Sequence, residues 1–219
     1  MSTAPFASDG DHSRLMDRVY RHQRHIYDAT RKYYLLGRDR MIAGLDMAEG
    51  QSLLEVGCGT GRNLAVVARH YPDARLFGLD ISSEMLVTAR AKLGYLRSEV
   101  TLRELDASRY LATDFDEPGF DRIMISYALS MIPEWERAVA ASLAALKPGG
   151  SLHIADFGQQ EGLPRWFGSA LRAWLRKFHV TPRADLESAL RGMIEGAPYR
   201  LEFKSHAQGY AWLAIIRRF

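Results

Sequence analysis

The sequence has a single cysteine, Cys58, among its 219 residues, which excludes a framework of intramolecular disulfides. It has no apolar run of the roughly 18 residues that a transmembrane helix needs, and its start lacks the charged and apolar regions of a secretory signal. The net charge is only +3, too small to indicate nucleic-acid binding by itself. His, Cys, Asp and Glu do not cluster at metal-ligand spacing, so no metal is expected. A cytoplasmic protein is predicted.

Hydrophobic residues make up 47% of the chain, enough for the core of one α/β domain at this length. Residues 1–11 are small and polar and are expected to form a disordered tail. Residues 12–219 are expected to form a single domain, with no internal repeat or low-complexity tract.

The most informative stretch is residues 53–63, LLEVGCGTGRN, in which an apolar run ends in Gly57, Gly59 and Gly61. A strand that stops at such a run turns sharply and leaves its backbone open to a ligand. A second apolar strand ends in Asp80, about 20 positions later, where doubly wound folds grip a ribose. The pair predicts a nucleoside ligand at the carboxyl ends of a parallel sheet; the alternative is a tight turn without a ligand.

The glycine spacing departs from the dinucleotide fingerprint. It reads G-x-G-x-G, and Arg62 stands where the third dinucleotide glycine would be. Glu55 precedes the loop by two residues, and a carboxylate there disfavours a pyrophosphate and favours a cationic ligand.

These residues resemble motif I of the class I S-adenosylmethionine-dependent methyltransferases, and Asp80 falls on the ribose-binding acid of that family. The likeness continues, in order, over roughly residues 50–157. It includes the adenine segment around Asp106, the fourth strand at 120–126, and a turn followed by the fifth strand at 146–152, with the strand itself expected over about 151–156. The resemblance implies S-adenosyl-L-methionine as cofactor and S-adenosyl-L-homocysteine as product. The cofactor-binding residues that it implies are Glu55, Gly57, Gly59, Gly61, Asp80, Ile81, Met85, Asp106, Ala107 and Ser126.

The same resemblance implies an α/β fold with a seven-stranded Rossmann-like sheet in the order 3-2-1-4-5-7-6, flanked by helices. Residues 12–45 would form an N-terminal helical cap, and the last 20 residues the antiparallel hairpin that ends the family's sheet. An insert at 158–198 would precede that hairpin as a lid or a membrane-facing segment.

Two segments lie outside the cofactor motifs and are expected to select the acceptor. One is 20–40, which mixes aromatic and basic residues. The other is 163–178, whose apolar residues recur at helical spacing, within a stretch (163–184) that has no acidic residue. A helix with aromatic and basic sides suits an anionic membrane surface, and equally suits a lid with a solvated basic face.

Residues 27–39 also resemble the start of small bacterial lipid N-methyltransferases. These are the enzymes that trimethylate diacylglyceryl-homoserine to a betaine lipid, and the phosphatidylethanolamine N-methyltransferases. This resemblance implies an amine-bearing lipid as acceptor and a peripheral position at the inner membrane face. Arg31, Tyr34 and Arg38 are the candidate substrate-binding residues, although one such basic residue could hold the carboxylate of the cofactor's methionine part instead.

An amine must lose a proton to accept a methyl group, so a nearby side chain or water must take it. Tyr127, just after the fourth strand, is the first candidate by topology, followed by Tyr27 and His25. Each tyrosine could instead pack against cofactor or core. Two alternatives stay open: a methyltransferase for a soluble small molecule, and a nucleic-acid-binding or regulatory module without turnover. The tetrad 126–129, SYAL, departs from the Asn-Pro-Pro-Tyr-like tetrad of base-methylating enzymes, so no nucleic acid is expected as partner.

Overall fold

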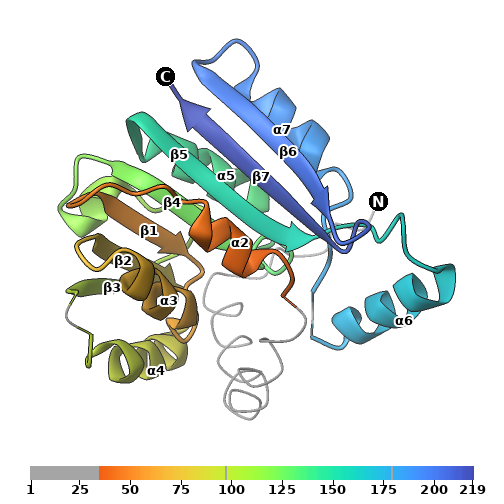
Figure 1. The fold of residues 1–219 in the computed structure, drawn as a ribbon, viewed down its shortest axis with the longest axis horizontal. Helices are drawn as coiled ribbons and strands as arrows, with labels where there is room; N and C mark the ends of the chain where they lie inside the picture. Colours follow the sequence, from red (N-terminus) through yellow and green to blue (C-terminus); the bar gives the residue numbers. More distant parts are fainter. Residues whose placement is uncertain (1–34, 97, 179) are drawn as a thin grey trace, which may run out of the picture.

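The computed structural model of the chain describes residues 35–96, 98–178 and 180–219 (Figure 1). The cap prediction for 12–34 therefore lies outside the described residues, as do the candidates His25, Tyr27, Arg31 and Tyr34.

A seven-stranded sheet in the order β3-β2-β1-β4-β5-β7-β6 forms the centre of the fold, which confirms the predicted topology. The strands β1 to β5 run parallel, whereas β7 pairs antiparallel with both β5 and β6. The strand bounds are β1 Ser52–Val56, β2 Arg75–Asp80, β3 Val100–Glu104, β4 Phe120–Ser126, β5 Leu146–Phe157, β6 Tyr199–His206 and β7 Ala211–Arg218. The parallel strands end at one edge of the sheet, where ligands bind in this class of fold.

Alternating side chains of the strands divide the core into two layers. Leu54 of β1 and Ile123 of β4 face α5 (Trp135–Ala144) and α7 (Leu186–Ile194). Their neighbours Leu53 and Met124 face the opposite layer. That layer is built from α2 (Arg38–Ala43), α3 (Arg62–His70), α4 (Ser83–Leu93) and α6 (Arg165–Arg176); a short 3₁₀ helix, η1 (Ala112–Phe115), precedes β4. No helix within the described residues combines the length and hydropathy of a membrane span.

The fifth strand begins earlier than predicted, at Leu146 rather than near 151. The Lys147–Gly150 segment, expected as a turn, forms a bulge within the strand: Leu146 pairs with Phe120 of β4, and the next pair joins Ser151 to Arg122. Gly149 takes a positive φ of 77° there, and an added Cβ at Gly150 would lie 2.9 Å from the Lys147 carbonyl oxygen. The glycines therefore let the strand bend without leaving the sheet.

The insert 158–198 divides between the two layers. Its first part contains α6, as the helical spacing predicts. Its second part contains α7, whose Leu186 and Leu190 are buried against the opposite face of the sheet. The second half of the insert is thus part of the core.

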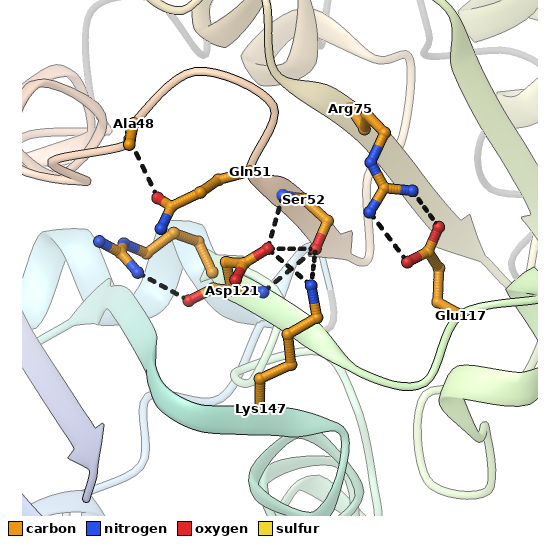
Figure 2. Close-up of polar contacts among 8 residues, drawn as sticks. Ala48, Gln51, Ser52, Arg75, Glu117, Asp121 and Lys147 are labelled. Atoms are coloured by element: carbon orange, nitrogen blue, oxygen red, sulfur yellow. Dashed lines mark hydrogen bonds and ion pairs between the residues drawn. The ribbon is translucent and has the colours of Figure 1, made fainter.

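A polar cluster ties together the amino ends of the strands, on the side away from the glycine loop (Figure 2). The Asp121 carboxylate accepts hydrogen bonds from the Ser52 backbone N–H at 2.9 Å and the Ser52 hydroxyl at 2.8 Å, and pairs with the Lys147 ammonium at 2.9 Å. Burial opposes ionisation of Asp121, but these three donors outweigh it and hold the pKa of the carboxyl below its usual range. The cluster joins β1, β4 and β5 where no ligand is expected.

A buried histidine makes the stability of the fold depend on pH. His153, on β5, is 1% exposed, and its Nε2 lies 2.9 Å from the Ser151 hydroxyl. Burial, with the charges of Arg122 and Arg217, lowers its pKa from 6.5 to about 3. In the unfolded chain the imidazole is protonated below pH 6.5, whereas in the fold it stays neutral until about pH 3. Stability is therefore lost as the pH falls through this window.

We expect the free energy of unfolding to fall by about 1.4 kcal/mol from this group between pH 7.5 and 5.5. A His153→Gln variant keeps a hydrogen-bonding partner for Ser151 and has no imidazole to titrate in this range. Urea unfolding at both pH values should therefore show a smaller loss for the variant than for the wild type. Equal losses would contradict the assignment.

Candidate functional site

The glycine loop turns over the carboxyl ends of β1 and β2. Gly57, Gly59 and Gly61 all have positive φ, at 72°, 53° and 71°. The backbone N–H groups of Gly57 and Cys58 both donate to the Leu79 carbonyl at 2.9 Å, and Gly61 is the N-cap of α3. An added Cβ at Gly57 would lie 2.8 Å from the Ala128 Cβ. Both the left-handed conformation and the close packing explain why glycine stands there.

Asp80, the last residue of β2, holds the loop in place. One carboxylate oxygen accepts from the Gly59 backbone N–H at 2.8 Å, and the other from the Ser82 N–H at 3.0 Å. Carboxylate oxygens are also the acceptors that a pair of ribose hydroxyls requires. Ser82 is the N-cap of α4, and of the two predicted neighbours Ile81 is half-buried and Met85 is buried in the first turn of that helix.

A carboxylate lies buried inside the site. Glu55 is 1% exposed in β1 and accepts from the Asn63 side-chain amide at 2.7 Å. Asn63 stands in the first turn of α3, directly past the glycine loop. Sequence reasoning missed it as a site residue, although its place one turn past the loop was a usable signal.

A cleft that is partly open to solvent lies between these elements. It is lined by Leu35, Arg38, Glu55, Gly57, Cys58, Thr60, Arg62, Asn63 and Ser126. Of the predicted cofactor residues, Glu55, Gly57 and Ser126 thus share one cavity. Thr60 and Arg62 were not predicted. No group of three or more potential metal ligands occurs among residues 35–96, 98–178 and 180–219.

Arg38 is the predicted substrate-binding residue that the structure describes, and it lines this same cleft. It is only 3% exposed, and its Nε lies 3.3 Å from a carboxylate oxygen of Asp39. The segment after its helix is held by Arg122, whose guanidinium donates to the carbonyls of Leu45 and Asp46 at 2.6 Å each. A buried guanidinium in a cleft suits an anionic group of a ligand.

Asp106 and Ala107 follow β3, beside the end of β2. The Leu105 backbone N–H donates to the Asp80 carbonyl at 3.1 Å, and one Asp106 carboxylate oxygen accepts from the N–H and the hydroxyl of Ser108 at 2.8 Å each. Asp106 is half-buried and Ala107 is buried. Asp80, Asp106 and Ala107 lie at the carboxyl ends of β2 and β3 and are not among the residues that line the cleft. The family resemblance implies that the ribose and adenine bind at these strand ends.

Tyr127 follows β4 in a backbone conformation that is rare for a side-chain-bearing residue, with φ 54°. It is 1% exposed, its ring lies edge-on to Phe157 at 4.7 Å, and its hydroxyl donates to the Leu36 carbonyl. Burial, with the nearby Asp156 and Tyr210, raises the pKa of the phenol. The phenol therefore stays protonated at neutral pH, and its role as proton acceptor stays a prediction.

The loop after β4 is held from two sides by residues that sequence reasoning did not single out. The fully buried Asp156 of β5 accepts from the Ser130 N–H at 3.1 Å. From the insert, Arg183 donates to the carbonyls of Leu129 at 3.1 Å and Ile132 at 2.7 Å. The insert thus helps to build the wall of the site nearest β4.

Helix α6 packs one side onto the layer that contains Tyr127. Phe167 and Trp174 are half-buried there, whereas Trp166 is 71% exposed. The helix and its C-cap also carry four exposed basic side chains, Arg165, Arg172, Arg176 and Lys177.

Comparison with known proteins agrees with this geometry. A family profile described as "Methyltransferase domain" matches residues 53–150. The demethylmenaquinone methyltransferase of Thermobifida fusca is 31% identical over 170 residues, 72% of this chain and 70% of that protein. The phosphatidylethanolamine N-methyltransferase of Cereibacter sphaeroides is 33% identical over 52% of this chain and 55% of its own length. The trans-aconitate 2-methyltransferase of Variovorax paradoxus is 32% identical over 52% and 41%. The chain thus spans about half the length of the last two.

Solved structures share the fold at low identity. The plantazolicin methyltransferase BpumL, solved with a substrate analogue and S-adenosylhomocysteine, superposes with a TM-score of 0.69 at 13% identity, covering 96% of this chain and 98% of that one. A putative methyltransferase solved with the Haloferax volcanii Trm112 activator gives a TM-score of 0.71 at 16% identity, covering 92% and 96%.

The order of the sheet, the left-handed glycine loop held by Asp80, and similarity to methyltransferases over most of the chain agree with one another. The chain therefore belongs to the class I S-adenosylmethionine-dependent methyltransferases, with S-adenosylmethionine as its cofactor.

Proposed function

We propose that the protein transfers methyl groups from S-adenosylmethionine to the amino group of a lipid headgroup, of the diacylglyceryl-homoserine or phosphatidylethanolamine type. The observation that carries the lipid part is α6, which exposes Trp166 and, along its length and at its C-cap, four basic side chains, while its other side packs on the layer that contains Tyr127. The relative from Cereibacter sphaeroides, named as a phosphatidylethanolamine N-methyltransferase, supports the same acceptor class.

The residues of the cleft fit the cofactor. The buried Glu55 carboxylate suits the methionine ammonium, and the buried Arg38 guanidinium suits the methionine carboxylate. Asp80 offers carboxylate oxygens to the ribose hydroxyls, and Asp106 lies where adenine is expected. Glycine at position 57 allows both the positive φ and the close contact with Ala128 that hold the loop at the edge of the cleft.

When bound, S-adenosylmethionine supplies a methyl group on a sulfonium, which an amine can attack in line. The protein's part is to hold both partners in that line and to exclude water from them. Ser126, the last residue of β4, lines the cleft, and Tyr127 follows it at the side where the acceptor would enter. The loop 128–132 is fixed there by Asp156 and Arg183. Aromatic faces near that entry would also stabilise an amine that gains methyl groups, by roughly 0.5–2 kcal/mol each.

A soluble acceptor is the second candidate. It is favoured by the packing of Phe167 and Trp174 against the core layer, which gives α6 a structural reason to be apolar on that side. The relative named as a trans-aconitate 2-methyltransferase carries a soluble acceptor in its name.

The deciding assay is transfer of radiolabelled methyl groups into an organic-extractable fraction. Purified protein would be given labelled S-adenosylmethionine and vesicles that contain phosphatidylethanolamine, diacylglyceryl-homoserine or neither. We expect label in the lipid fraction only where an amine headgroup is present. Transfer to soluble carboxylates or amines, with none to vesicles, would instead support the second candidate.

The exposed tryptophan of α6 gives the membrane part its own test. Trp166→Ala should lower co-sedimentation with anionic vesicles about 3- to 10-fold, because an interfacial indole and its basic neighbours contribute most of the attraction. Tyr95→Ala is the matched control. Tyr95 is an aromatic residue that is 93% exposed, and it follows α4, which lies well away from α6 (Figure 1). Removing Phe167 and Trp174 as well should lower binding further. Unchanged co-sedimentation of the Trp166 variant would show that α6 is an ordinary lid.

A further inference from the structure

Arg38 can act in the cleft only if the short segment that carries it is held in one place. Its helix, α2, has six residues, Arg38–Ala43, which is too short to be stable without packing. The residues just before the helix therefore need anchors from elsewhere in the fold.

The anchor at the start of α2 comes from the end of β4. The Tyr127 hydroxyl donates to the carbonyl of Leu36, two residues before Arg38. Leu35 packs in the same apolar layer as Tyr127, Phe157 and Tyr210. Gly37 follows with a φ of 80°, and a Cβ there would lie 3.1 Å from a methyl carbon of Leu213 on β7. The turn into α2 thus lies between Tyr127 and the strand β7.

Tyr127 is itself held rigidly. Its backbone N–H donates to the Ala155 carbonyl at 2.7 Å, and its ring rests edge-on against Phe157 at 4.7 Å. Its φ of 54° is maintained by this packing and costs conformational energy, a cost that recurs at functional sites. The preceding residue, Ser126, lines the same cleft as Arg38.

We propose that Tyr127 is a positioning residue, whose hydroxyl fixes the Leu35–Gly37 turn and thereby places the Arg38 guanidinium in the cofactor cleft. It acts through Arg38 on cofactor affinity and takes no proton from the acceptor. This inference rests on the proposed role of Arg38 toward the cofactor carboxylate.

The test compares two buried tyrosines. Tyr127→Phe removes the hydrogen bond to Leu36 and keeps the ring. Tyr110→Phe is the matched control, because Tyr110 is 2% exposed and its hydroxyl donates to the Ser142 hydroxyl at 3.0 Å in the other core layer, away from the cleft. Both variants lose one buried hydrogen bond and should lose similar stability.

Calorimetry with S-adenosylhomocysteine should show a Kd raised about 3- to 10-fold in Tyr127→Phe and unchanged in Tyr110→Phe. In an Arg38→Gln background, which itself should weaken binding, adding Tyr127→Phe should change the Kd less than about twofold, because the group that it positions is gone. The pH dependence of kcat should be the same in wild type and Tyr127→Phe.

An unchanged Kd in Tyr127→Phe would overturn the inference, as would full additivity with Arg38→Gln. A large fall in kcat with a displaced pH profile would assign Tyr127 to proton transfer instead. Failure of the wild type to bind S-adenosylhomocysteine would contradict the proposed function, an outcome distinct from the other three.

Discussion

Asp80→Ala should raise the Kd for S-adenosylmethionine at least about 100-fold, the largest effect that we expect from a single substitution. The carboxylate has two duties at the end of β2. It accepts from the backbone N–H groups of Gly59 and Ser82, and it offers carboxylate oxygens to the two ribose hydroxyls. Alanine removes the ribose partners and leaves two backbone donors of the loop without this acceptor. Titration calorimetry would measure the change.

The control for Asp80 is Asp114→Ala. Asp114 also accepts a backbone hydrogen bond through its carboxylate, from the Leu111 N–H at 2.8 Å, but it lies in η1 on an exposed surface. Its removal should leave the cofactor Kd unchanged. Near-wild-type affinity in Asp80→Ala would refute the cofactor site as described.

Gly57→Ala should disable the site by geometry rather than by charge. Alanine at a φ of 72° is strained, and its Cβ would meet the Ala128 Cβ at 2.8 Å, a distance at which backbone must move. We expect a loss of about 2–4 kcal/mol in the free energy of unfolding, together with a Kd for S-adenosylhomocysteine raised at least about 30-fold. Urea unfolding and calorimetry would report the two effects separately.

Gly192→Ala provides the opposite control. Gly192 lies inside α7, and an added Cβ would meet no atom within 4 Å. Alanine should therefore stabilise the protein by about 0.5–1 kcal/mol and leave the cofactor Kd unchanged. Equal effects of alanine at Gly57 and Gly192 on stability and on the cofactor Kd would contradict the role assigned to the close packing of the loop against Ala128.

The strand-to-loop units of the fold could be predicted because their signals are local. An apolar run that ends in glycines, and another that ends in Asp80, each specify a strand and the turn after it. Helix α4 was likewise predictable from Ser82, whose side chain caps it. The start of β5 was not, because Lys147–Gly150 has the composition of a turn, whereas in the structure it is a bulge inside a strand whose pairing with β4 already begins at Leu146.

The residues of the site divide in the same way. Glu55, Gly57 and Ser126 were predicted from motifs, and the structure places them in one cleft. Asn63, Asp156 and Arg183 were missed, because each acts through a hydrogen bond to a residue that is distant in sequence or on another element. The contacts of Asp156 and Arg183 leave no spacing pattern in a single sequence, whereas Asn63 could have been found from its place just past the glycine loop.

The sequence by itself determined the fold class through local hydrophobic patterns and glycine turns, and it determined the sheet order and the cofactor through its resemblance to a known family. Only the tertiary structure decided that the buried Arg38 lines the same cleft as Glu55, that the Tyr127 hydroxyl contacts the Leu36 carbonyl, and that α6 turns Trp166 outward while Phe167 packs inward. The physical reason is that burial and long-range hydrogen bonds arise from how separate elements pack, and packing depends on all of them at once.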